Sequence, residues 1–376
     1  MGETATKKQI KMHHHGRSFQ VLIYLGKIVR IFFYQNDWKV LPMAAIVAGM
    51  ASLVVRAGMF HSMERTLTGS LALSCVALWN GFFNSIQVIC RERSIVKREH
   101  RSGLHISAYV LAHMIFQAVL CALQSVITIY VCTLVEIPFP TNGLITKYYL
   151  LDLAITLFLV AYASDMTSLF VSSIVHSTTA AMTVMPFILI FQLVFSGGIF
   201  SLPRSIEPLT NLTISHYGLK SIAAQSGYND LPMQSAWETL NKMKNSEVDA
   251  KVTLDQLMEV LKTNKNASLE ELRSKELDNG MTVKEAMELF TSSSDYKQYS
   301  DVVFPVQFKV SDVIDIIGEN KAKGLVDEKS KAAGQNKEYD KTVENVARCW
   351  LTLGLMTLLM ALLSVIALEF IDKDKR

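Results

Sequence analysis

The chain alternates long apolar blocks with shorter polar segments. Blocks of about 20 largely uncharged residues match the roughly 30 Å hydrocarbon core of a bilayer, because an α-helix rises about 1.5 Å per residue. The blocks of this kind lie at about 38–58, 69–90, 106–132, 148–174, 177–199 and 347–369. The block at 38–58 lacks the short apolar core and the cleavage site that are typical of a signal peptide, so no cleavage is expected. The pattern predicts an all-α membrane protein with six transmembrane helices.

Two segments before the first block have different patterns. Residues 1–16 are polar and contain His13, His14 and His15. Because no second cluster of metal ligands lies nearby, we interpret them as a flexible tail rather than a metal site. In residues 17–37, polar and basic residues recur at helical spacing, with apolar residues on the other faces. This pattern predicts an amphipathic helix in the membrane interface, with its basic groups toward the lipid head groups.

The long segment before the last block changes in composition along its length. Residues 200–225 follow the fifth block and are expected to re-enter the membrane surface. Residues 226–345 are rich in Lys, Glu, Asp, Ser and Asn, with several helical patterns and a β-rich piece at 302–310. We expect a mostly helical extracytoplasmic domain there, followed by a last span and a cytoplasmic tail in 346–376.

Basic residues in the short loops predict the orientation of the chain. They concentrate before the first block, in the loop 91–103 and at the C-terminus, whereas the loops 59–68 and 133–147 hold few. Because loops rich in Lys and Arg stay inside, both termini and residues 91–103 are expected in the cytoplasm. All five cysteines fall in or beside the apolar blocks. An exterior domain without disulfides favours a bacterial cytoplasmic membrane.

Composition and motifs exclude several classes of function. Half of the residues are hydrophobic and only 19% are charged, which suits a membrane protein better than a soluble one. No basic stripe with interleaved aromatics indicates nucleic-acid binding. The sequence contains no GxxxxGK[ST] phosphate loop and no CxxC, HExxH or GxSxG motif. We therefore expect no enzyme activity and no bound cofactor or metal, and any use of ATP must come from another chain.

The loop RERSIVKREHRSG at 91–103 is densely charged between two apolar blocks. Glu92 and Glu99 are seven residues apart, which is two helical turns, so they share one face of a helix. Five basic residues alone would satisfy the orientation rule, and the two glutamates are not needed for it. The alternative is that the loop only anchors the chain at the cytoplasmic surface.

Several motifs in this order resemble one family. The pattern E-x6-E-H-x-S-G of the charged loop is followed by the pair Ala108-Tyr109, and further motifs are VAYASDMTSLFVSS at 160–173, VFSGGIF at 194–200 and SHYGLKSIA at 215–223. Together they resemble the white/ABCG-type permeases, the membrane halves of type-2 ABC exporters. The resemblance covers roughly residues 17–225 and the last span, and leaves out the exterior domain.

The resemblance implies how such a chain would work. Two permease subunits, identical or sister chains, would form a dimer in the lipid bilayer. A separate nucleotide-binding ATPase subunit, with ATP and Mg, would drive alternating access for a hydrophobic or amphipathic substrate. Residues 17–37 would be the connecting helix and 91–103 the coupling helix on the ATPase. The coupling residues would be Glu92, Arg93, Arg98, Glu99, His100 and Gly103.

The resemblance also points to a pathway between spans 2 and 5. The candidate lining residues are Asn80, Asn84, Thr183, Pro186, Ile190 and Phe191. The asparagines could equally join neighbouring helices by hydrogen bonds. The candidate outer gate is Phe195, Gly198 and Ile199, where the family often has a leucine pair and this chain has Gly-Ile.

Asp165 is an ionisable residue near the middle of the fourth span. A carboxyl group at that depth is costly and is a functional candidate, but a structural hydrogen bond to a neighbouring helix is the alternative. A different class of function also stays open: a membrane sensor or immunity protein that binds a ligand with its exterior domain. A neighbouring gene for an ATPase would favour the transporter.

Overall fold

The computed structural model describes residues 16–370, except 57, 201–202, 204, 264–266, 278–279, 294–295, 297–300 and 302. The expected flexible tail before residue 16 and the cytoplasmic tail after residue 370 lie outside these residues. The chain divides into two compact units. Unit 1 comprises residues 1–231 and 336–376, and unit 2 comprises residues 232–335.

The regular secondary structure in the described part of unit 1 is helical, apart from an isolated β-bridge between Asn142 and Tyr148. Its α-helices are α1 (Arg17–Tyr34), α2 (Val40–Arg56), α3 (Met63–Ser85), α4 (Val88–Arg101), α5 (Ile106–Leu134), α6 (Tyr149–Ile174), α7 (Thr178–Val194), α8 (Ile214–Gln225) and α16 (Val343–Glu369). Short 3-10 helices stand at Asp37–Lys39, Glu207–Leu212, Tyr228–Asp230 and Lys337–Tyr339. The amphipathic pattern before the first apolar block forms α1.

Within the described residues, five helices are long and apolar enough to cross a membrane. They are α2 with the short helix before it, α3 continuing into α4, α5, α6 and α16. They correspond to five of the six predicted spans, and they confirm the prediction of an integral membrane protein. The remaining block forms α7, an apolar helix of only 17 residues with Pro186 inside it.

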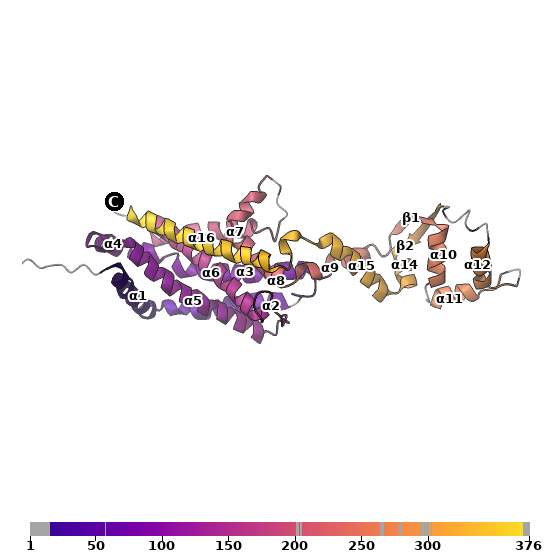
Figure 1. The fold of residues 1–376 in the computed structure, drawn as a ribbon, viewed down its shortest axis with the longest axis horizontal. Helices are drawn as coiled ribbons and strands as arrows, with labels where there is room; N and C mark the ends of the chain where they lie inside the picture. The colour runs from indigo at the N-terminus through magenta and orange to yellow at the C-terminus, as the bar shows by residue number, and fades with distance from the viewer. Residues whose placement is uncertain are drawn as a thin grey trace, which may run out of the picture. The chain divides into compact units, whose positions relative to one another are not determined.

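Two glycines allow the central helices to approach closely. A Cβ atom added at Gly81 of α3 would lie 2.0 Å from Ser164 Oγ and 2.1 Å from the Ala161 carbonyl oxygen of α6. One at Gly218 of α8 would lie 2.2 Å from Ser74 Oγ of α3. Small residues let helix backbones pack this closely in membranes, where dispersion rather than water exclusion holds helices together. The centre of unit 1 is therefore α3 packed on α6 and α8, with α16 beside them (Figure 1).

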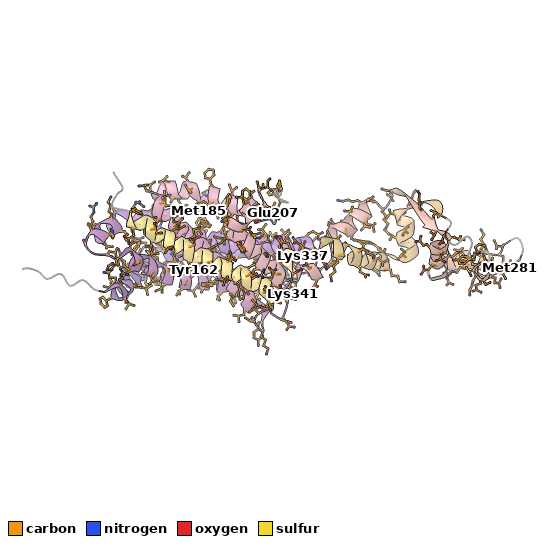
Figure 2. The ribbon with its side chains drawn as sticks, turned by 45° about the horizontal axis from the view of Figure 1, so that its top comes forward. Tyr162, Met185, Glu207, Met281, Lys337 and Lys341 are labelled. Atoms are coloured by element: carbon orange, nitrogen blue, oxygen red, sulfur yellow. The ribbon has the colours of Figure 1, made fainter. Side chains whose placement is uncertain are left out.

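Most buried polar side chains in the described part of the bundle bond to backbone groups or to each other. Ser70 and Thr357 each donate to the carbonyl oxygen four residues earlier in their own helix. Tyr162 of α6, labelled in Figure 2, donates to the Met114 carbonyl oxygen of α5 at 3.1 Å. Asp152 accepts three backbone N–H groups from residues 144–146, at 2.7 to 2.9 Å. These bonds offset the cost of burying polar groups away from water.

Unit 2 is mostly helical and also contains a two-stranded antiparallel sheet. Its elements are α9 (Gln234–Lys242), β1 (Glu247–Thr253), α10 (Leu254–Thr263), α11 (Ala267–Ser274), α12 (Val283–Ser292), β2 (Val303–Lys309), α14 (Val310–Ile317) and α15 (Glu319–Gly334). Strand β2 arises from the predicted β-rich piece, and it pairs with β1, which the composition did not reveal. A small core of Val310, Ile314 and Ala322 packs against Trp237 and Leu240.

We predict that Gly81→Ala destabilises unit 1. The added methyl group would overlap the Ala161 carbonyl oxygen, and overpacking of this kind typically costs about 1–3 kcal/mol. Gly354→Ala in α16 is the matched control, because a Cβ atom there has no neighbour within 4 Å. Thermal unfolding in detergent should show a melting temperature lowered by several degrees for Gly81→Ala and unchanged or raised for Gly354→Ala. Equal melting temperatures would show that the α3–α6 contact can relax.

Candidate functional site

Helix α4 lies at one end of the bundle, together with α1 and the carboxyl end of α16 (Figure 1). The helix ends at Arg101, and two residues later Gly103 has a φ of 105°, in the region that favours glycine. The Gly103 and Leu104 N–H groups bond back to the carbonyl oxygens of His100 and Glu99. Glycine adopts this conformation without a steric penalty. The N–H groups of Gly103 and Leu104 can then bond to the last carbonyl groups of the helix, and the chain turns into α5.

The two glutamates of α4 both contact α1. Lys27 Nζ lies 3.8 Å from Glu92 Oε2 and 3.4 Å from Glu99 Oε1. Tyr24, one turn before Lys27, donates its hydroxyl to Glu99 Oε2 at 2.9 Å. Burial and the neighbouring Glu99 raise the pKa of Tyr24 well above its usual value, so the phenol stays a donor. The glutamates therefore share one face of α4, and α1 occupies that face.

Arg93 and the start of α4 contact the end of α6. Arg93 donates to the carbonyl oxygens of Ser173, at 2.7 Å, and Val175, at 3.4 Å. The Ser172 hydroxyl accepts the Ile89 and Cys90 N–H groups at 3.1 and 3.2 Å. A cation at the carboxyl end of a helix interacts favourably with the helix dipole. Helix α4 is thus held to both α1 and α6.

The remaining coupling candidates lie toward the end of α4. Arg98 is exposed, and so are Ser94 and Arg101 on the same helix. His100 Nδ1 lies 3.2 Å from the Leu104 carbonyl oxygen and so supports the turn at the end of α4. The structure therefore separates residues that hold α4 to its own chain from a basic surface that it leaves exposed.

The pathway candidates of α3 differ in their surroundings. Asn80 is buried among helices. Asn84 is half-buried and exchanges two hydrogen bonds with Gln124 of α5, at 2.9 and 3.0 Å. A paired amide of this kind joins two helices, which is the structural alternative considered for Asn84.

The pathway candidates of α7 lie on a helix that is exposed along most of its length. Thr183 bonds to the Thr179 carbonyl oxygen of its own helix, and Pro186 is exposed. Ile190 is 57% exposed. Phe191 packs against Phe195 with ring centroids 4.8 Å apart.

An apolar surface runs over α3 and α7. Its most exposed large side chains are Trp79, Phe83, Phe187 and Ile190. A cavity of about 160 Å³ lies between the two helices, lined by residues that include Cys75, Leu189 and Ile190. An exposed apolar surface of this kind in a bundle suits contact with lipid or with another apolar helix surface.

The gate candidates follow α7 in a turn that packs on α8. Gly197 has a φ of 78°, and a Cβ atom added at Gly198 would come within 2.8 Å of the Leu219 side chain. Ile199 is exposed. Gln192 accepts the Ile214 N–H group at 2.8 Å, and His216 Nδ1 lies 3.1 Å from the Ser196 carbonyl oxygen. The F-S-G and H-Y-G motifs therefore meet in space.

Asp165 is fully buried in α6, and Cys121 of α5 donates its thiol to Asp165 Oδ2 at 3.5 Å. The contact joins two helices inside the bundle. Within the described residues, no group of three His, Cys, Asp or Glu side chains is placed to hold a metal ion.

Sequence reasoning missed the α1 partners of the glutamates. Tyr24 and Lys27 are three residues apart and so share a face of α1. Their spacing indicated a polar stripe but not its contact with α4, which lies far along the chain. The ion pair between Arg91 and Asp37, at 2.9 Å, was missed for the same reason.

The fold and the site define a polytopic membrane protein with a charged helix at one end of its bundle. The chain belongs to the ABC-2 type transporter family, whose model matches residues 20–217, more than half of the chain. The predicted resemblance to type-2 transporter permeases is thereby confirmed at the level of this family. Members of this family form the membrane component of ABC-2 type transporters.

A curated relative supports this assignment. Over 155 residues, 40% of this chain, the sequence is 30% identical to an ABC transporter ATP-binding/permease protein of Mycobacterium tuberculosis. The chain spans only 18% of the length of that relative.

We predict that Lys27→Met loosens the contact between α1 and α4. The change leaves Glu92 and Glu99 close together without their shared cation, and exposed or half-exposed pairs of this kind contribute about 1 kcal/mol or less each. Hydrogen–deuterium exchange should become severalfold faster in α1 and α4. Arg30→Met, an exposed basic residue on the same helix, is the control and should leave exchange unchanged. Identical exchange in both variants would contradict the assigned role of Lys27.

Proposed function

We propose that the chain is the permease subunit of an ATP-binding cassette exporter that moves a hydrophobic or amphipathic substrate by alternating access. The observation that carries the proposal is the attachment of α4 to both α1 and α6 at one end of the bundle. A helix held in this way can pass a displacement at its exposed surface to two other helices. Membership of the ABC-2 family and the combined ATP-binding and permease name of the relative support it.

The proposed topology has six spans, with α7 as the fifth. Helix α1 lies in the cytoplasmic interface of the membrane, α4 and both termini lie on the cytoplasmic side, and unit 2 lies outside. The basic residues of α1 and α4 and the position of both helices at the end where α16 finishes support this orientation. A bacterial cytoplasmic membrane suits a unit 2 without cysteine.

In this proposal the ATPase subunit binds α4 and carries ATP and Mg. Because Glu92 and Glu99 contact α1, the surface left for the ATPase includes the exposed Ser94, Arg98 and Arg101. Arg98 would set the charge complementarity with the ATPase, while Glu99, Arg93, His100 and Gly103 would hold α4 in place. Charges across such an interface set partner choice and register more than affinity.

A second permease subunit would pack against the apolar surface of α3 and α7. That surface exposes Trp79, Phe83, Phe187 and Ile190. The pathway would run between the two copies of these helices, with Ile190 and Phe191 toward it and Phe195 and Ile199 near its outer end. Asn84 and Asp165 would contribute mainly by joining helices.

We predict that Arg98→Glu weakens assembly with the ATPase subunit. Placing a like charge at such an interface costs several kcal/mol, which corresponds to about a 100-fold loss of affinity or more. Glu99→Gln should keep assembly but reduce the stimulated ATP hydrolysis, because it weakens the contacts with Tyr24 and Lys27.

These variants are tested on the permease purified with its nucleotide-binding subunit. Arg56→Glu is the control, because Arg56 pairs with Glu136 near the carboxyl end of α2, away from α4. It should change neither assembly nor hydrolysis. If assembly and stimulation survived both α4 substitutions, the coupling role of α4 would be wrong.

The proposed topology predicts opposite labelling of two single cysteines. In a variant without the five native cysteines, Ser330→Cys in unit 2 should react with a membrane-impermeant maleimide on intact cells. Ser102→Cys after α4 should react only once the membrane is opened. Both positions lie in polar segments near helix ends, so neither change should disturb a core. Labelling of Ser102→Cys on intact cells would invert or refute the topology.

A further inference from the structure

Two cavities adjoin one another between α1, α2 and α5. The first has a volume of about 190 Å³ and is bounded also by the end of α3, the start of α4 and Met182 of α7. The second has a volume of about 370 Å³ and opens along α1 and α5. Both are lined by Phe32, Phe116 and Leu120, so the two cavities lie side by side at these three side chains. The outer cavity alone has a size in the range of about 300–1,000 Å³ that is usual for small-molecule sites.

The inner cavity ends in buried polar groups that lack partners. His113 and Gln117 lie one turn apart on α5, and each is only 3% exposed. Neither ring nitrogen of His113, nor Gln117 Oε1, makes a hydrogen bond with any described residue. The amide nitrogen of Gln117 is used, since it donates to Ser85 Oγ at 2.9 Å. Buried polar atoms are nearly always paired, so three unpaired atoms on two side chains that line one cavity indicate a ligand with hydrogen-bonding groups, which meets these atoms once the two side chains turn toward it.

The charged groups at this end already have partners. Arg91 pairs with Asp37 at 2.9 Å, and Glu92 lies 3.8 Å from Lys27. A charged ligand head group would have to compete with these pairs, and an anion would also meet Asp37 and Glu92 in the cavity wall. The orphaned imidazole and amide oxygen are suited instead to an uncharged group that both donates and accepts, such as a hydroxyl.

The outer cavity is apolar and lies at the lipid-facing side of the bundle. Its wall consists of aromatic and aliphatic side chains, among which Phe33, Trp38, Val119 and Leu123 are largely exposed. In a bilayer these side chains contact acyl chains. The inner cavity therefore has polar groups in its wall and the outer cavity is apolar, which matches the polar head and apolar chain of an amphiphile.

We propose that the two neighbouring cavities together bind an uncharged, single-chain amphiphile from the membrane with a hydroxyl-bearing head group, whose acyl chain separates the side chains shared by both. The hydroxyl group donates to Gln117 Oε1 and bonds to His113, and the acyl chain passes Phe32, Phe116 and Leu120 toward the lipid. The head group lies beside Arg91 and Glu92, at the start of α4. The site is assigned from unit 1 alone and does not depend on ATP coupling.

Photolabelling of the full-length protein tests the site. The probe is a monooleoylglycerol analogue with a diazirine in its acyl chain, in phosphatidylcholine nanodiscs. Peptide mapping should place the label mainly on α1 and α5 around Phe32, Phe33 and Leu123. Unlabelled monooleoylglycerol should compete at least tenfold better than methyl oleate, which has no hydroxyl, or oleate, which is charged, since each lost bond or added charge costs about 1.4 kcal/mol or more.

Three variants separate the two ends of the site. Gln117→Met keeps the size of the side chain but removes the acceptor, together with the amide donor to Ser85, and it should lower labelling severalfold. Val119→Trp fills the outer cavity from an exposed position that tolerates bulk, and it should do the same. Thr128→Val, at a buried position of α5 outside both cavities, is the control and should label normally.

Several results would overturn the proposal. They are label spread evenly over lipid-facing helices, equal competition by methyl oleate or oleate, and unchanged labelling of both Gln117→Met and Val119→Trp. The labelling needs no ATPase subunit, so the site and the transport function can fail separately.

Discussion

The close approach of α3 to α6 and α8 is the contact on which the rest of unit 1 depends. It exists because Gly81 and Gly218 have no side chain where Ser164, the Ala161 carbonyl group and Ser74 lie. Helix α4 follows directly from α3, so the position of α3 on α6 decides whether Arg93 reaches the last carbonyl groups of α6. A methyl group added at Gly81 or Gly218 would thus also change the position of α4 at the end of the bundle.

The polar residues of unit 1 fall into two groups with different effects. Inside the bundle, many hydroxyl groups bond to their own helices, as Ser70 and Thr357 do, and a few, such as that of Tyr162, bond to a neighbouring helix. At the end that carries α4, charged and phenolic groups bond between helices, as Lys27 and Tyr24 do with Glu99. Because these pairs are partly solvated, each contributes modestly, and together they set the orientation of α4 more than its stability.

Much of this arrangement could be predicted from the sequence. Apolar blocks located the long helices, and the two-turn spacing of Glu92 and Glu99 predicted their shared face. Spacing along one helix cannot say which other helix covers that face, so the role of Lys27 was hidden. Strand β1 was missed because three of its seven residues, Glu247, Asp249 and Lys251, are charged, which hid the apolar positions that alternate with them. The cavity beside His113 was invisible because its walls come from separate helices.

The distribution of cysteine has a consequence for where the protein can fold. All five thiols are free and belong to unit 1, four of them buried, and unit 2 has none. Unit 2 therefore relies on its small apolar core and its sheet rather than on covalent cross-links. Its fold needs no oxidant and no disulfide exchange, so the same structure is compatible with a reducing and an oxidising compartment.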